Sequence, residues 1–314
     1  MPTKLRHEEV SAERATVRDL LAQATEVGDV LGARQFEQRL QKLNAELNLL
    51  NSLVEKNASA ALFFGGPKVL GSRGIDASFA GDALERFQDL VSKVFARREL
   101  GSLGARGPIA AQSDSKLMVT AVTRGSFGFV LEEVGDQEEA LRTQLSEVVT
   151  DVVDFVAKIA DPAEDPFIDA IADIDSRLLS STKAFFDSLA NAQATLKIVE
   201  GAREVSLGRE DVERAKERTE GIELVEQNAV QLTGLLFGLL PAHRRFEFVL
   251  QESGETISGK VATDASREIG EQVLQGLSNP VGHRWLGEFD VREVRRPNKP
   301  AKRFYTLQRL IREV

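Results

Sequence analysis

Apolar and polar residues alternate most regularly between residues 116 and 134, where the pattern predicts a β-hairpin. Two apolar runs with a period of two meet at Arg124-Gly125-Ser126, which supplies the turn. A second pair of short strands is predicted between residues 195 and 207, with its turn at Glu200-Gly201. We expect the first hairpin to be the nucleus of the sheet in the main domain.

Residues 8 to 56 carry helical patterns that break at Gly28-Asp29, so they predict two helices joined by a short turn. The second helix has a heptad seam formed by Phe36, Leu40, Leu43, Leu47, Leu50 and Val54. The first helix has a looser stripe formed by Val10, Val17, Leu20, Leu21, Ala24 and Val27. Two interpretations stay open: the hairpin packs within its own domain, or it forms an intermolecular coiled coil that sets an oligomer.

The middle of the chain alternates helical patterns with glycine-rich segments. Helices are predicted over residues 82–100, 136–160, 166–190 and 210–226, and a loop over residues 101–115. The last of these helices has few apolar anchors, so we expect it to face solvent or to connect domains.

From residue 228 the pattern becomes that of strands. Five strands and one short helix are predicted, at 230–239, 245–251, 255–261, 285–294 and 302–310, with the helix at 266–277. This order suggests a small, partly closed β-barrel, OB-like or SH3-like. The fold class is therefore α+β: a helical hairpin at 1–57, an α+β domain at 58–227 and a small β-barrel at 228–314.

Composition narrows the classes of function. The net charge is −9. Cysteine is absent, and its absence excludes disulfides, thiolate metal sites and cysteine nucleophiles. The three histidines, His7, His243 and His283, are too far apart in sequence to suggest a metal motif. The longest apolar run, residues 235–241, is far below the roughly 20 residues that span a bilayer. We expect a cytoplasmic protein with no cofactor, no metal and no membrane partner.

The C-terminal segment is basic although the chain is acidic. Residues 283–314 hold nine Lys/Arg and four Asp/Glu, with aromatic residues between them. Basic side chains next to aromatic rings are typical of surfaces that bind single-stranded nucleic acid. A solvated face or a protein-docking face has the same composition. The candidate binding residues are Arg244, Arg245, Trp285, Arg292, Arg295, Arg296, Lys299, Lys302 and Arg303.

Three other patterns invite a chemical interpretation. The glycine-rich loop at 65–74 lacks the Lys and Ser/Thr of a phosphate-binding loop, so it predicts a structural turn. Asp165, Asp169 and Asp173 repeat at helical spacing, which an acidic helix start explains, with a divalent-cation site completed by other ligands as the alternative. The hairpin tip Arg124-Gly125-Ser126 is a candidate anion site, with a plain turn as the alternative.

No catalytic motif emerges, so architecture and partners guide the functional hypotheses. The first is a non-enzymatic assembly or adaptor protein that self-associates and docks protein partners. The second is a nucleic-acid-binding protein that uses the C-terminal barrel. The third is an enzyme whose site has no recognisable sequence pattern.

Overall fold

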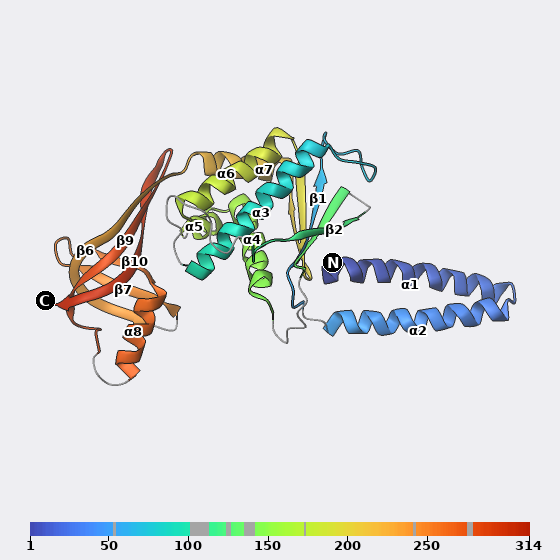
Figure 1. The fold of residues 1–314 in the computed structure, drawn as a ribbon, viewed down its shortest axis with the longest axis horizontal. Coiled ribbons are helices and arrows are strands. Elements are labelled where there is room, and N and C mark those ends of the chain that lie inside the picture. Colours follow the sequence, from blue (N-terminus) through green and yellow to red (C-terminus); the bar gives the residue numbers. More distant parts are fainter. Residues whose placement is uncertain are drawn as a thin grey trace. The chain divides into compact units, whose positions relative to one another are not determined.

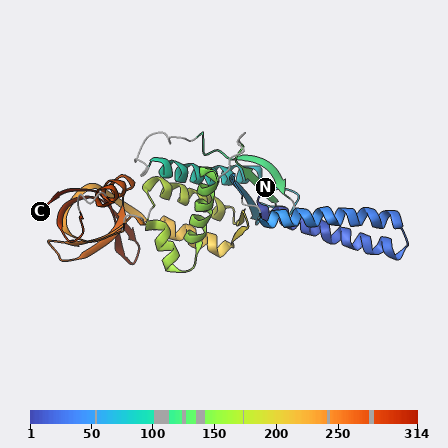
Figure 2. The same ribbon diagram turned by 90° about the horizontal axis from the view of Figure 1, so that it is seen from below.

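The computed structural model of the chain combines helices and sheets, as the sequence predicts (Figures 1 and 2). It describes residues 1–52, 55–100, 113–123, 127–134, 142–172, 174–240, 243–274 and 279–314. The described chain divides into two compact units, Met1–Glu220 and Gly221–Val314, and each is treated by itself. The three-part division at 57 and 227 stays a prediction.

An antiparallel helical hairpin opens the first unit and is here called the arm: α1 (Thr3–Glu26) and α2 (Val30–Ser52). The buried side chains between the two helices are Val10, Val17, Leu43 and Leu47. The described part of the predicted seam, from Phe36 to Leu50, therefore packs against α1 of the same chain, and Val54 lies outside the described residues.

Two residues at the turn of the arm fix its geometry. Gly28 has a φ of +72°, a left-handed conformation that glycine adopts without a Cβ clash. The Asp29 carboxylate accepts a hydrogen bond from the Gly32 N–H at 2.9 Å and so caps the start of α2. The break predicted at Gly28-Asp29 is confirmed.

The base of the arm is attached to the sheet of the same unit. The Lys4 N–H donates to the Gly201 carbonyl at 3.0 Å, and the Lys4 ammonium pairs with Glu204 at 2.7 Å. Leu5 packs onto the apolar cluster formed by Ala61, Phe63, Val130 and Val199. The first turn of α1 therefore joins the core of the sheet through this cluster.

Five antiparallel strands form this sheet in the order β2-β3-β1-β4-β5. Their bounds are β1 Ser59–Gly65, β2 Met118–Thr123, β3 Phe127–Glu132, β4 Thr195–Glu200 and β5 Arg203–Leu207. Both predicted strand pairs are present, but the central strand is β1, not the hairpin that we expected to be the nucleus. Residues 60–64 are all buried because both faces of β1 are covered, and this explains a continuous apolar run without alternation.

Helices are stacked over one face of the sheet. They are α3 Ala77–Leu100, α4 Gln144–Ala160, α5 Glu164–Ala172, α6 Ser176–Asn191 and α7 Arg209–Glu220. α3, α4 and α7 contact the strands, whereas α5 packs on α4 and α6 packs on α3 and α7. On this face the Phe64 ring meets Phe79 of α3 edge to face, with ring centroids 5.4 Å apart. Buried Phe185 joins α6 to Phe87 of α3, at 6.3 Å. These rings form the centre of the first core.

Several helix boundaries differ from the sequence prediction. The helices predicted to begin at residues 8, 82 and 266 begin at Thr3, Ala77 and Thr263. The helix predicted over 166–190 is two helices, because Asp175 accepts a hydrogen bond from the Leu178 N–H at 2.8 Å and starts α6. The helix predicted to reach 226 ends at Glu220, and a strand begins at Glu223. The start predicted at 136 for the helix before Ala160 lies outside the described residues.

The second unit is a five-stranded sheet that closes on itself in the order β10-β8-β7-β6-β9, with the pair β8 and β10 parallel. Its elements are β6 Glu223–Leu240, β7 Arg245–Leu250, β8 Thr256–Val261, α8 Thr263–Leu274, β9 Arg284–Arg296 and β10 Lys299–Glu313. We call this sheet the ring. All five predicted strands and the short helix are present, and β6, β9 and β10 are longer than predicted.

The interior of the ring is filled by aromatic side chains. Phe289 is fully buried and lies 5.5 Å from Phe246 and 5.2 Å from Phe248, measured between ring centroids. A Cβ at Gly259 would lie 2.0 Å from the Tyr305 carbonyl oxygen, so glycine permits the close approach of β8 and β10. Closure of the ring thus depends on one small residue at the parallel pair.

Candidate functional site

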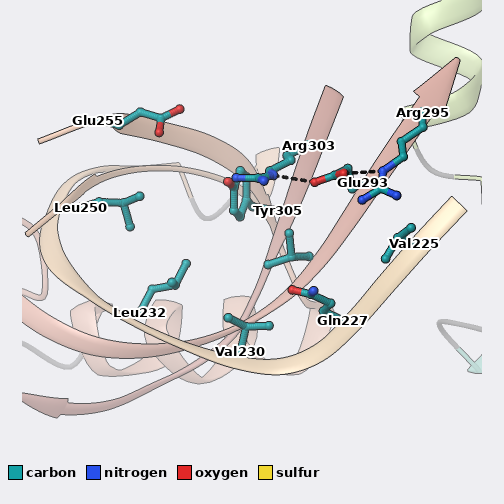
Figure 3. A pocket seen from close by; sticks show the side chains of 11 residues that line it. Val225, Gln227, Val230, Leu232, Leu250, Glu255, Glu293, Arg295, Arg303 and Tyr305 are labelled. Carbon is teal, nitrogen blue, oxygen red and sulfur yellow. Dashed lines mark hydrogen bonds and ion pairs between the residues drawn. The ribbon is translucent and has the colours of Figure 1, made fainter. Parts of the chain in front are cut away.

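The ring holds a cavity of about 270 Å³, which we call the mouth (Figure 3). Its apolar lining comes from three strands and includes Leu232, Leu250 and Val291. These three side chains also pack against the buried core of the ring, so the mouth continues the core outward. A small apolar group could therefore enter the mouth without meeting an unpaired buried charge.

An ion-pair network lies at the rim of the mouth. Glu293 accepts hydrogen bonds from Arg303 at 2.8 Å and from Arg295 at 2.7 Å (Figure 3). The donors Arg303 and Arg295 lower the pKa of Glu293, and its carboxylate in turn raises the pKa of each guanidinium. Both arginines are thus partly neutralised by a carboxylate of the ring itself.

The other predicted residues of the β9–β10 pair lie away from the mouth. Arg292 alternates with Val291 and Glu293 along β9, so it points to the opposite face, where it pairs with Glu226 at 3.4 Å. On the same face the Lys302 ammonium lies 5.6 Å from the centre of the Phe304 ring. Arg296 ends β9 and Lys299 begins β10, on either side of the turn.

The remaining candidates lie elsewhere on the second unit. Arg244 precedes β7 and donates to the Thr263 hydroxyl at 2.6 Å. Arg245 begins β7 and lies opposite Lys260 of β8. The Trp285 indole N–H donates to the Pro280 carbonyl at 2.9 Å, and its ring packs against the core. The predicted set is therefore divided between the mouth, the opposite face of β9–β10 and the strands β7 and β8.

The other sequence candidates have structural explanations or fall outside the description. The predicted anion site Arg124-Gly125-Ser126 lies outside the described residues, as does Asp173. In the glycine-rich loop, Val69 and Ile75 form an isolated bridge, and Asp76 caps α3 through the Phe79 N–H at 2.9 Å. Among the described residues, no group of three or more His, Asp or Glu side chains could hold a metal ion.

Sequence reasoning missed an apolar group at the tip of the arm. Val27, Val30 and Leu31 are 78%, 78% and 77% exposed. The predicted stripe of α1 includes Val27, but the helix ends at Glu26 and the Val27 side chain is exposed. Aliphatic residues directly beside a glycine turn were the available signal, since a turn usually carries polar residues. We call these three residues the tip.

Searches against protein families, curated proteins and solved structures found no match to this chain. Among the helices in the described ranges, none has the length and apolar character required to cross a membrane. Interpretation of function therefore depends on the surfaces of the chain itself.

Proposed function

We propose that the chain is an assembly or adaptor protein and that the arm presents the tip to a protein partner. The observation that carries the proposal is the strong exposure of Val27, Val30 and Leu31 together. Exposed aliphatic groups of this kind mark sites of protein interaction when they cluster rather than scatter. The mouth gives no comparable support to an enzyme, because the carboxylate of Glu293 at its rim is paired with Arg295 and Arg303.

The construction of the arm supports this role. Helices of 24 and 23 residues extend for about 36 Å, and the first turn of α1 packs on the sheet through Leu5. The glycine turn and the Asp29 cap hold the tip in one conformation. A preorganised tip loses little conformational entropy on binding, which favours affinity from a small apolar surface.

Photocrosslinking tests the proposal. A benzophenone amino acid at position 31 should give discrete adducts in the native cell, and the same probe at exposed Gln41 on the side of α2 should not. With the purified adduct partner, the variant Val27→Ser, Val30→Ser, Leu31→Ser should bind at least about tenfold more weakly. The matched control Leu49→Ser, at another exposed aliphatic residue of α2, should bind normally. Equal binding by both variants would overturn the proposal.

A second candidate, nucleic-acid binding, has one specific observation in its favour. The ring has the strand order of an OB-fold: its first strand pairs with its second and fourth, its third and fifth strands are parallel, and α8 lies between the third and fourth. This order favours the OB-like over the SH3-like prediction. Glu226 and Glu293 already pair with Arg292, Arg295 and Arg303, which weakens attraction to phosphate.

Retention on single-stranded DNA and RNA columns separates this candidate from the first. If the ring binds nucleic acid, retention should fall as salt rises, and Arg295→Ala with Arg296→Ala should abolish it. Arg267→Ala on α8 removes an exposed, acid-paired arginine and is the matched control. Elution at low salt, or equal losses in both variants, would exclude the ring as a nucleic-acid site.

A further inference from the structure

The two edges of the five-stranded sheet differ in how they are protected. β5 forms one edge and carries Arg203 and Glu204, which pair with Asp154 of α4 and Lys4 of α1. β2 forms the other edge and reads Met-Val-Thr-Ala-Val-Thr, without a charged residue or a proline. Natural sheets usually protect an open edge with charge, proline, a β-bulge or a cover, and of these devices β2 itself has a bulge between Val119 and Ala121. Within the described ranges no strand pairs with the outer side of β2.

β2 is also strongly exposed for a strand of apolar composition. Met118, Val119 and Val122 are 56%, 50% and 54% exposed. The strand is nevertheless held in place, because the Gln88 side chain of α3 donates to the Ser115 carbonyl at 2.8 Å and accepts from the Leu117 N–H at 2.9 Å. The edge is therefore both open and preorganised, which are the conditions for strand addition.

A β-bulge gives β2 an unusual arrangement of side chains. Val119 lies opposite Leu131 of β3 and Ala121 lies opposite Val130, so Thr120 is an extra residue. Val122 then lies opposite Phe129. Because alternate residues of β3 share a face, Leu131 and Phe129 place Val119 and Val122 on one face, although these valines are three positions apart.

The bulge makes β2 self-complementary. In an antiparallel pair of two β2 strands, centred between Thr120 and Ala121, Val119 lies opposite Val122 of the second copy. Met118 lies opposite Thr123 of the second copy in the same register. A two-fold axis perpendicular to the sheet places each face of one copy beside the same face of the other, so residues that lie opposite each other must be on the same face of β2. The bulge meets this requirement because it puts Val119 and Val122 on one face. A regular strand would place the two valines on opposite faces.

We infer that a second copy of this chain binds along β2, which joins the two five-stranded sheets into one. Each copy supplies Val119 and Val122, so two equivalent valine pairs cover the exposed face. The inference deepens the proposed assembly role by naming one partner, and it does not depend on the tip. Because only six residues pair, the dimer is expected to dissociate on dilution.

The absence of cysteine from the full chain allows a register-specific test. Two full-length variants are made, Val119→Cys and Val122→Cys. Residues directly opposite in an antiparallel pair have Cα atoms about 4.5–5.5 Å apart, which suits a disulfide. Identical positions would lie about 10 Å apart along the strands, too far for a disulfide. Under mild oxidation the mixture should therefore form a covalent dimer, and either variant alone should not.

Analytical ultracentrifugation provides the second arm. The unmodified chain should dimerise with concentration, and Val119→Lys with Val122→Lys should weaken the dimer on the order of tenfold or more. Mixing this variant with Val119→Glu, Val122→Glu should restore a dimer, which shows that both variants fold. Ser206→Lys on the opposite edge is the matched control and should dimerise normally.

Several results would overturn the inference. They are a monomer at every concentration, equal crosslinking by the single variants and the mixture, or a dimer that the β2 charges leave intact. If only the Val27→Ser, Val30→Ser, Leu31→Ser variant loses the dimer, the tip and not β2 is the dimer interface. Partner binding that the Val27→Ser, Val30→Ser, Leu31→Ser variant leaves unchanged, together with an intact β2 dimer, would instead refute the proposed function alone.

Discussion

The substitution Phe289→Ala tests whether the ring has its own core. Phe289 is fully buried and contacts two further rings, so its truncation removes aromatic contacts and leaves a cavity. The expected cost is about 4 kcal/mol. For a unit of this size, about 5 °C of midpoint is lost per kcal/mol, which gives a decrease of about 20 °C in the ring.

Two spectroscopic signals distinguish the units. Trp285 is the single tryptophan of the chain and packs against the ring core, so its fluorescence reports the second unit. The described helices α1 to α7 all belong to the first unit, so circular dichroism at 222 nm reports mainly that unit. Phe289→Ala should lower the fluorescence midpoint by about 20 °C and leave the dichroism midpoint nearly unchanged.

The matched variant is Phe185→Ala in α6, which removes an equally buried ring from the first core. It should lower the dichroism midpoint and leave the fluorescence midpoint in place. If either substitution shifts both midpoints together, the two units unfold as one cooperative structure. The reasoning that assigns each its own core would then be refuted.

Three smaller predictions concern single features. Asp29→Ala removes the cap of α2 and should lower the free energy of unfolding by about 1 kcal/mol, measured by urea denaturation, whereas Asp29→Asn should be nearly neutral. The lowered pKa of Glu293 contributes stability that is present above the ordinary glutamate pKa of about 4.3 and is lost as the pH falls below it. The fluorescence midpoint should therefore fall as the pH falls through this range, and it should fall less in Glu293→Gln. If the midpoint of Glu293→Gln depends on pH as steeply as that of the unmodified chain, the ion pairs of Glu293 have no role. Gly259→Ala places a Cβ against the Tyr305 carbonyl and should prevent closure of the ring, seen as loss of the fluorescence transition; Ser258→Ala on the same strand should not.

Much of the architecture could be predicted because its signals are local. Both strand pairs of the first sheet show alternation and a glycine turn, and the arm shows helical stripes broken at Gly28. The five strands of the ring were found in order for the same reason. The further interpretation that these strands form an OB-like barrel is supported by strand order and remains a proposal.

The central position of β1 could not be predicted from the sequence. A five-residue apolar run is compatible with a buried strand or part of a helix. Its place is set by pairing with residues 127–132 and 195–200, which are distant in sequence. The break before α6 had a local signal, Asp175 ahead of a helical stripe, but continuous helical spacing concealed it.

The candidate site shows the same limit. Basic composition at 283–314 was visible, but whether an arginine meets a carboxylate depends on the register between strands. Arg292 reaches Glu226 only because β6 and β9 pair over eleven positions, 66 residues apart at this pair. Composition therefore identified a charged region, and pairing across strands determined how much of that charge is available to a partner.

The parallel pair of β8 and β10 has a consequence for how the ring folds. β10 is hydrogen-bonded to both β8 and β9, so it is the strand that closes the ring. During synthesis β6, β7 and β8 emerge first, and β8 keeps a free edge until β10 follows more than 35 residues later. Closure requires this long-range contact before the core is sealed, which slows folding and exposes an edge to aggregation. Folding of the second unit should therefore be limited by the arrival of its last strand.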